Sequence, residues 1–303
     1  MRRGRLQWRR QGLFPYVLLL PALLVVGVFV IYPVCQAILM STYDITMSSR
    51  GGARFVGLLN YREMVLSGEF WRALWVTLAY VMGSVSGAYL LGLGTALLIS
   101  MPMFGRKIIR LCLILPWALP QVVVAMVWML MYDYQYGIVN YLLRWIHLLD
   151  RNINWLGDPS KTVPMVAVLL PSIWNQYPVA TLMLLAGLLM IPDDLYEAAA
   201  IDGANAFERF RNVTWPGLRP VTNVLILLFT IWAFKRFDLI YLMTQGGPLQ
   251  ATETLIVQTY LQAFQFWNMG YAAALGTVSL VVSLVFSTAY LLRIRRTGEG
   301  ALE

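Results

Sequence analysis

The segment that decides the fold is DDLYEAAAIDGANAFERFRNVTWPG, residues 193–217. It opens with acids, continues through small residues and ends with arginines, yet it lies between two strongly apolar stretches, 162–192 and 220–234. Apolar runs separated by a polar piece are the pattern of helices that cross a membrane and of the loop that joins them.

The composition of the whole chain indicates an integral membrane protein. Of its 303 residues 59% are hydrophobic and only 13% are charged, whereas a soluble domain has about a quarter of its residues charged. A spanning helix needs roughly 20 apolar residues, so the run 220–234 is expected to continue through Lys235, Arg236 and Asp238. We expect an all-α protein with six transmembrane helices, near 14–39, 74–100, 108–131, 164–190, 219–243 and 270–292.

The distribution of the basic residues predicts the orientation. The formal net charge is +8, but the cations gather near every second set of helix ends, which is the positive-inside pattern and argues against nucleic-acid binding. Both termini are therefore expected in the cytoplasm. The cytoplasmic cations are Arg2, Arg3, Arg5, Arg9, Arg10, Arg106, Lys107, Arg110, Arg209, Arg211, Arg219, Arg293, Arg295 and Arg296.

The N-terminal apolar run resembles a secretory signal, but from Gly12 to Met40 it is too long, so it is expected to remain as the first helix. Cys35 and Cys112 both fall inside predicted spans and indicate core packing, not a disulfide framework. The expected division is residues 1–72 for the N-tail, first helix and outer loop, 73–292 for the permeation core, and 293–303 for a cytoplasmic C-tail.

Catalytic motifs are absent from the sequence. It contains no G-x-x-x-x-G-K-[ST] phosphate loop, no G-x-S-x-G turn and no H-E-x-x-H pair. The single histidine, His147, has no cysteine or carboxylate spaced to share a metal with it. We therefore expect neither an enzyme nor a cofactor on this chain.

The segment 191–218 is the largest internal cytoplasmic loop in this topology. Pro192 followed by Asp193 and Asp194 predicts a helix start. Gly203 costs about 1 kcal/mol in a helix and indicates either a bend between two short helices or a place of very close approach. Trp215-Pro216-Gly217 is expected to end the loop. An interfacial helix would carry a Leu/Phe face. The small residues found here instead suit insertion into a groove of another cytoplasmic protein.

These residues carry a resemblance. Glu197-Ala198-Ala199, Gly203 and then Val213-x-Trp215-Pro216 resemble the EAA loop, E-A-A-x3-G-x9-I-x-L-P, of binding-protein-dependent ABC importer permeases. Val213 and Trp215 depart from the Ile and Leu of that pattern. The runs FVGLLNYREM (55–64), LAGLLMIPDDLYEAAAIDGA (185–204) and FDLIYLMTQGGPLQATETL (237–255) are similar to the carbohydrate type, and the resemblance covers about residues 14–292.

The resemblance implies a type I ABC importer permease fold with a cytoplasmic coupling-helix loop. It implies a second, homologous permease, two ATP-binding cassette subunits that hold ATP and Mg, and an extracytoplasmic binding protein that the Gln245–Thr254 segment is expected to touch. The location it implies is a bacterial or archaeal cytoplasmic (inner) membrane. The ATPase-coupling residues would be Glu197, Ala198, Ala199, Asp202, Gly203 and Pro216.

A substrate path is expected near the middle of the membrane, on interrupted helices with polar linings. Pro171 and Pro178 bracket a polar aromatic patch in the fourth span, and the third span holds a similar patch. Amides beside aromatic faces suit a sugar, although they can also simply join helices. The candidates are Trp117, Gln121, Trp174, Asn175, Gln176, Tyr177, Lys235 and Asp238.

Lys235, Arg236 and Asp238 admit two interpretations. Ionisable residues inside a span are costly and indicate function, for example a cation that screens an anionic sugar. Near a helix end, however, snorkelling or a Lys235–Asp238 pair would make them ordinary. The family usually has a neutral residue where Lys235 and Arg236 stand.

Two other classes of protein are compatible with six spans. An ion-coupled carrier that works without an ATPase would need acids or histidines inside the spans, and only Asp238 qualifies. A channel or structural subunit would leave the small-residue loop without a purpose.

Overall fold

The structure, a computed structural model, describes residues 14–46, 52–101 and 104–299. The basic residues of the expected N-tail, 1–13, and the last residues of the expected C-tail, 300–303, lie outside the described part. The chain divides into two compact units. Unit 1 comprises residues up to Leu66 and Leu261–Val278, and unit 2 comprises Ser67–Tyr260 and the residues from Ser279 onward.

Unit 1 contains the first span, a small hairpin and the beginning of the last helix. Its elements are α1 (Phe14–Val26), the π-helical turn η2 (Gly27–Ile31), α2 (Tyr32–Met40), β1 (Tyr43–Asp44), β2 (Arg54–Phe55), α3 (Leu59–Leu66), the π-helical turn η4 (Leu261–Gln265) and the first part of α14 (Met269–Glu299). β1 and β2 are antiparallel, with Tyr43 opposite Phe55.

Asn60 explains much of how unit 1 holds together. Its Nδ2 donates to the backbone oxygens of Ser41 (2.8 Å) and Tyr43 (3.0 Å). The neighbouring Tyr61 hydroxyl lies 2.6 Å from Ser41 Oγ. The run that the sequence singled out as FVGLLNYREM thus ties α3 to the end of the first span.

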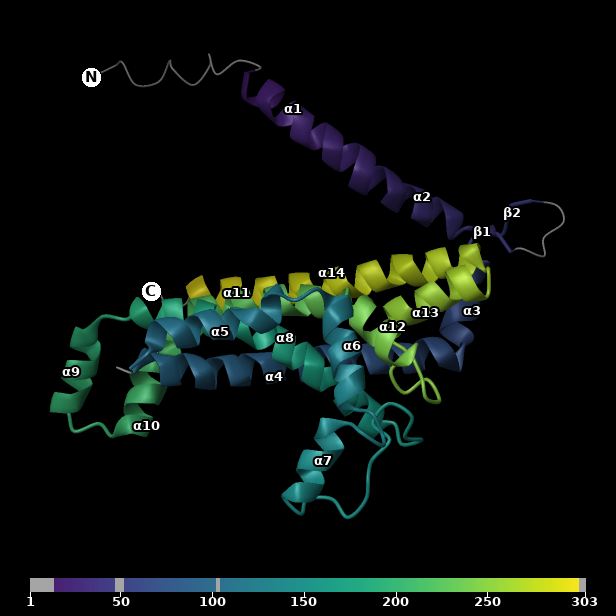
Figure 1. The fold of residues 1–303 in the computed structure, drawn as a ribbon. Coiled ribbons are helices and arrows are strands. Elements are labelled where there is room, and N and C mark those ends of the chain that lie inside the picture. The colour runs from purple at the N-terminus through teal and green to yellow at the C-terminus, as the bar shows by residue number, and fades with distance from the viewer. Residues whose placement is uncertain (1–13, 47–51, 102–103, 300–303) are drawn as a thin grey trace, which may run out of the picture. The chain divides into compact units, whose positions relative to one another are not determined.

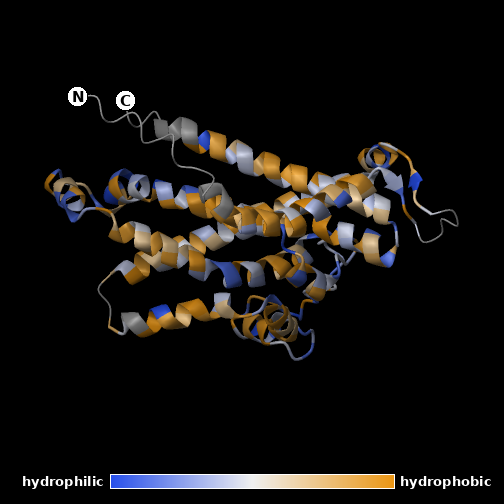
Figure 2. Ribbon diagram, turned by 90° about the horizontal axis from the view of Figure 1, so that it is seen from above, coloured by the Kyte–Doolittle hydropathy of each residue, from blue (hydrophilic) through white to orange (hydrophobic). Residues whose placement is uncertain are grey.

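Unit 2 is a helical bundle in which α4 (Gly68–Ser100), α8 (Thr162–Leu189) and α11 (Trp215–Phe234) pack against one another (Figure 1). The long helices are predominantly hydrophobic along their length (Figure 2). Small residues let α4 and α8 approach closely: a Cβ on Gly92 would collide with Ala180 and come within 3.1 Å of the Thr181 backbone nitrogen. Such close approach through small residues is typical of helices that pack inside membranes.

The third span is broken. α5 (Arg106–Ala118) and α6 (Gln121–Met131) meet at an angle of 96°. The break falls at Leu119-Pro120, both of which have extended ψ angles. Proline supplies no backbone N–H, and the residue before it disfavours the helical conformation. α8, by contrast, runs unbroken through Pro171 and Pro178, so the interruption lies in the third span and not in the fourth.

Two expectations about the fifth span are wrong. First, the helix does not continue through Lys235, Arg236 and Asp238: α11 ends at Phe234, and a new helix, α12 (Asp238–Thr244), begins after a non-helical link. A Lys235–Asp238 pair on one helix is therefore not formed. The fifth span is therefore shorter than expected at its C-terminal end, and it is longer than expected at its N-terminal end.

Second, Trp215-Pro216-Gly217 does not end the loop. α10 (Ala206–Arg209), the π-helical turn η3 (Phe210–Thr214) and α11 form one continuous run of 29 residues. The Trp215 N–H bonds to the Phe210 oxygen, five residues back. Pro216 has no N–H for the usual helical hydrogen bond, and the π turn, with its wider spacing, lies directly before it in the continuous helix.

Five helical segments are long and apolar enough to cross a membrane, or six if the bent α5–α6 pair counts as one span, over the part of the chain that is described. The six expected spans thus correspond to helices, with the third bent and the fifth displaced toward the N-terminus. The remaining elements of unit 2 are α7 (Ile138–Trp145), α9 (Asp193–Ile201) and α13 (Leu255–Tyr260).

Candidate functional site

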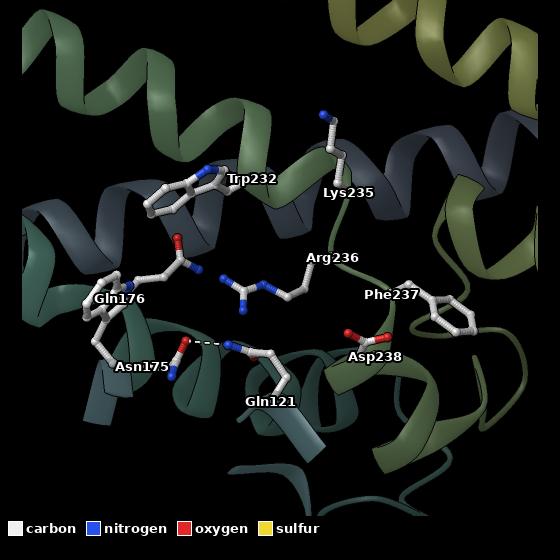
Figure 3. Close-up of a pocket in the computed structure, with 9 residues that line it drawn as sticks. Gln121, Asn175, Gln176, Trp232, Lys235, Arg236, Phe237 and Asp238 are labelled. Carbon is white, nitrogen blue, oxygen red and sulfur yellow. Dashed lines mark hydrogen bonds between the residues drawn. The ribbon is translucent and has the colours of Figure 1, made fainter. Parts of the chain in front are cut away.

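A pocket of about 330 Å³ opens in unit 2 where the two broken spans meet α8. Six sequence candidates line it, and Figure 3 shows most of them around one space. Asn175 and Gln176 lie at the middle of α8, which runs from Thr162 to Leu189. The lining residues are Trp117, Gln121, Asn175, Gln176, Trp232, Lys235, Arg236, Phe237 and Asp238.

Asn175 stabilises the break in the third span by pairing a backbone oxygen that the break leaves without a donor. Because Pro120 has no N–H, the oxygen of Pro116, four residues earlier, lacks its helical donor. Asn175 Nδ2 donates to that oxygen at 2.6 Å, and Asn175 Oδ1 accepts from Gln121 Nε2 at 2.7 Å. The side chain is 2% exposed. Asn175 therefore joins helices, which is the structural role that the sequence left as an alternative.

Gln176 is different. It is 1% exposed, and neither its Nε2 nor its Oε1 has a hydrogen-bond partner. Gln121 Oε1 is also buried without a partner. Buried amide groups are almost always paired, and an unpaired one costs about 1–3 kcal/mol. Groups of this kind at the wall of a pocket are available to a ligand.

The three ionisable residues at the end of α11 all line the pocket. They lie on the link and at the start of α12, and their side chains diverge. The Arg236 guanidinium extends toward the Gln176 amide, while the Lys235 amine points away from the centre (Figure 3). Asp238 occupies the first turn of α12, where the helix dipole favours an acid.

Trp174 and Tyr177, two further candidates, do not line the pocket. Trp174 packs edge-on against Trp128, with ring centroids 6.1 Å apart. Sequence reasoning in turn missed Trp232 and Phe237 as lining residues. The signal for Phe237 was present, because the charged pair before it and the acid after it mark the end of one helix and the start of another.

The predicted docking loop forms two short helices with a bend between them. α9 ends at Ile201, and Gly203 has a φ of +77°, a left-handed conformation that glycine adopts without strain. α10 then begins with a capping box. Asn205 Oδ1 accepts from the Glu208 N–H at 3.0 Å, and Glu208 Oε2 accepts from the Asn205 N–H at 2.8 Å.

The loop presents its candidate residues to the outside. Glu197, Ala198, Asp202 and Gly203 are exposed, whereas Ala199 and Pro216 are half-buried. One side-chain bond, between the Tyr196 hydroxyl and Thr214 Oγ1 at 3.0 Å, ties α9 to η3. The sequence reasoning overlooked two large apolar side chains here, Ile201 and Phe207, which are 87% and 70% exposed. Their exposure beside small residues is typical of a surface that meets another protein.

In the described residues no cluster of histidine, cysteine or acidic side chains could hold a metal ion. The pocket offers amides and indole rings beside the ionisable side chains of Lys235, Arg236 and Asp238. The amides and rings can bind hydroxyl groups and the C–H faces of a polar ligand.

Comparison with known proteins places both regions in a family. The model of the "Binding-protein-dependent transport system inner membrane component" family matches residues 88–298. The trehalose/maltose transport system permease protein MalF of Thermococcus litoralis is 40% identical over 286 residues, covering 93% of this chain and 94% of MalF. The sulfoquinovosyl glycerol transport system permease protein SmoG of Agrobacterium fabrum is 36% identical over 285 residues, covering 94% of this chain and 91% of SmoG.

Solved structures agree on the fold. A chain of a bacterial alginate ABC transporter, crystallised with an alginate pentasaccharide-bound periplasmic protein, has a TM-score of 0.80 and 24% identity. The match covers 96% of this chain and 98% of that one. The family match and the identity to these permeases show that the chain is a non-catalytic membrane component, and it belongs to the family of binding-protein-dependent ABC importer permeases.

Proposed function

We propose that this chain is one permease subunit of an ATP-driven importer of a carbohydrate. It forms half of the translocation path, with a second permease as the other half, and couples to two ATPase subunits through the α9–α10 loop. ATP and Mg are held by those ATPases, and an extracytoplasmic binding protein delivers the substrate. Both termini lie in the cytoplasm of a bacterial or archaeal cell.

The observation that carries the proposal is the shape of the α9–α10 loop. Two short helices meet at Gly203 and expose small side chains around Glu197, at the end of the bundle where α8 ends and the α10–α11 run begins (Figure 1). A rigid pair of helices fixed to two spans transmits a push from a partner to both spans at once. The ATPases would close when they bind ATP and would move these loops. The spans would then rearrange so that the pocket opens to the other side of the membrane.

Two features support a carbohydrate as the substrate. The relatives include permeases named for trehalose/maltose and for sulfoquinovosyl glycerol. The pocket combines the unpaired amide of Gln176 with the indoles of Trp117 and Trp232, and amides with flat rings fit the hydroxyl groups and C–H faces of a sugar. Gln245 and Leu249 are the exposed residues of the Gln245–Thr254 segment and are the proposed contacts of the binding protein.

The test is ATP hydrolysis by the co-purified complex, with and without the substrate-loaded binding protein. The native chain should bring down an ATPase. Glu197→Lys should lower stimulated hydrolysis at least about tenfold, since an unfavourable interfacial charge costs more than 1.4 kcal/mol. Glu63→Lys is the control, because Glu63 is also exposed but lies in α3. If no ATPase co-purifies, or if Glu197→Lys behaves like Glu63→Lys, the coupling role is wrong.

A further inference from the structure

We propose that Arg236, with Gln176 as a second ligand, makes the pocket selective for a sugar that carries an oxyanion: a carboxylate, a sulfonate or a phosphate. This inference rests on the proposed function and specifies the chemical class of its substrate. It also assigns different roles to two neighbouring cations.

Arg236 and Lys235 differ in direction although they are adjacent in the chain. Both line the pocket, yet in Figure 3 only the guanidinium reaches across it, toward the amide of Gln176. The Lys235 side chain points out of the space that the other residues enclose (Figure 3). The Arg236 cation therefore points into the pocket, and the Lys235 cation does not.

The charge of Arg236 is not neutralised where it lies. Asp238 is the one acid among the lining residues, but its carboxylate lies behind the guanidinium, which extends away from it (Figure 3). Within the described part of the chain no ion pair joins Asp238 to either cation. The acid is itself accommodated by the first turn of α12. The Tyr80 hydroxyl also interacts with the guanidinium, but a hydroxyl group does not balance its charge.

An uncompensated guanidinium inside a membrane protein is costly, and its natural partner is an anion. A neutral sugar would offer hydroxyl groups to the guanidinium but would leave its charge unbalanced. An oxyanion balances it and accepts two parallel N–H bonds from one guanidinium. This difference favours an anionic ligand over a neutral one.

Gln176 completes the site. Its Nε2 and Oε1 are both buried and unpaired, so the Nε2 can donate to the same oxyanion while the Oε1 accepts from a sugar hydroxyl. The side chain is held on α8, an unbroken helix, whereas Arg236 sits on the link between α11 and α12. A ligand that joins them would bridge the straight span and the broken one.

The charge of the pocket can be measured without knowing the natural substrate. The assembled complex is prepared with Cys35→Ser and Cys112→Ser, and a reporter thiol is introduced by Trp117→Cys, at a side chain that is 51% exposed at the pocket. Two reagents of similar size are compared, the anionic 2-sulfonatoethyl and the cationic 2-(trimethylammonio)ethyl methanethiosulfonate. The readout is the ratio of their reaction rates, and Gln121→Cys serves as a second reporter.

Each reagent's rate is first divided by its rate with a free thiol in solution. On this scale the anionic reagent should react about tenfold faster or more than the cationic one, because a charged cleft concentrates counter-ions by about 10 to 10³. Arg236→Gln should abolish this preference, Arg236→Lys should retain part of it, and Lys235→Gln should leave most of it. A ratio near one, or a ratio that falls equally in Arg236→Gln and Lys235→Gln, would overturn the proposal.

Uptake by the complex with its native Trp117 separates the two claims. If ATP-dependent uptake of the substrate occurs and its KM rises at least about tenfold in Arg236→Gln only, selectivity for an oxyanion is supported. A transported neutral sugar whose KM is unchanged in Arg236→Gln would overturn it while leaving the permease function intact. Absence of ATP-dependent uptake would contradict the proposed function itself, whatever the reagent ratio.

Discussion

The two functional regions both depend on an interrupted helix and on one asparagine, but they are built in opposite ways. In the α9–α10 loop, Asn205 bonds to Glu208, three residues away, in an exposed turn. In the pocket, Asn175 bonds to Pro116, 59 residues away, inside the bundle. A local interruption can form wherever its own few residues are placed. A long-range one exists only after the helices have packed.

The largest effect is expected at the long-range asparagine. Asn175→Leu would leave the Pro116 oxygen and the Gln121 amide without partners in a buried site, at a cost of about 2 kcal/mol or more. Unfolding of the purified protein in detergent should show this loss. Asn175→Asp keeps an acceptor for Gln121 but removes the donor to the Pro116 oxygen, so it should also lose stability. An unchanged stability would mean that water reaches the break and that the two regions are less different than they appear.

Gly203 offers the next test, on the local side of the comparison. Its φ of +77° is costly for a residue with a branched Cβ, so Gly203→Val should destabilise the bend by about 1–2 kcal/mol. Hydrogen exchange should speed up in residues 199–209 while the rest of the bundle keeps its protection. Gly203→Asn, which tolerates this conformation, is the matched control. A Gly203→Val variant with native exchange would show that the bend does not need the left-handed residue.

Asn205 should have a smaller effect. Asn205→Ala removes one half of the capping box and should cost about 1 kcal/mol, seen as faster exchange at the start of α10 without a change in global unfolding. Glu208→Ala should cost little more when it is added to Asn205→Ala, since the two bonds support each other. Additive losses, or a fall in global stability as large as that of Asn175→Leu, would contradict the local character of this turn.

The smallest effect concerns a buried acid outside the spans. Burial raises the pKa of Glu253, with Arg72 opposing and Glu69 adding to the rise. Since the folded pKa is the higher one, the stabilising contribution is complete below the ordinary value of 4.5 and is lost as the pH rises through the folded pKa. Glu253→Gln should therefore flatten the decline of the melting temperature above about pH 4.5. Glu69→Gln, at an exposed position, removes only a lesser cause of the raised pKa and should flatten the decline less. A native slope in Glu253→Gln would refute this assignment.

Prolines show why the sequence predicted the loop better than the pocket. Pro120 breaks a span, but Pro171 and Pro178 lie inside an unbroken helix. The residue type is the same, so a proline alone does not decide whether a helix breaks. At Pro120 the freed carbonyl of Pro116 is paired by Asn175 of another helix, and no pattern within the third span indicates this partner. The end of α11 at Phe234 is a different case, because the apolar run also ends there and only the length required of a span favoured a longer helix.

The sequence by itself determined the membrane class, the approximate spans, the exposed loop with its bend at Gly203 and the candidate amides of α8. Each follows from apolar length or from hydrogen bonds between residues only a few positions apart. Only the tertiary structure decided that Asn175 supports the break, that Gln176 remains unpaired, and that Arg236 faces the pocket while Lys235 does not. These depend on contacts between distant helices and on side-chain directions, which arise from packing and leave no local pattern in the sequence.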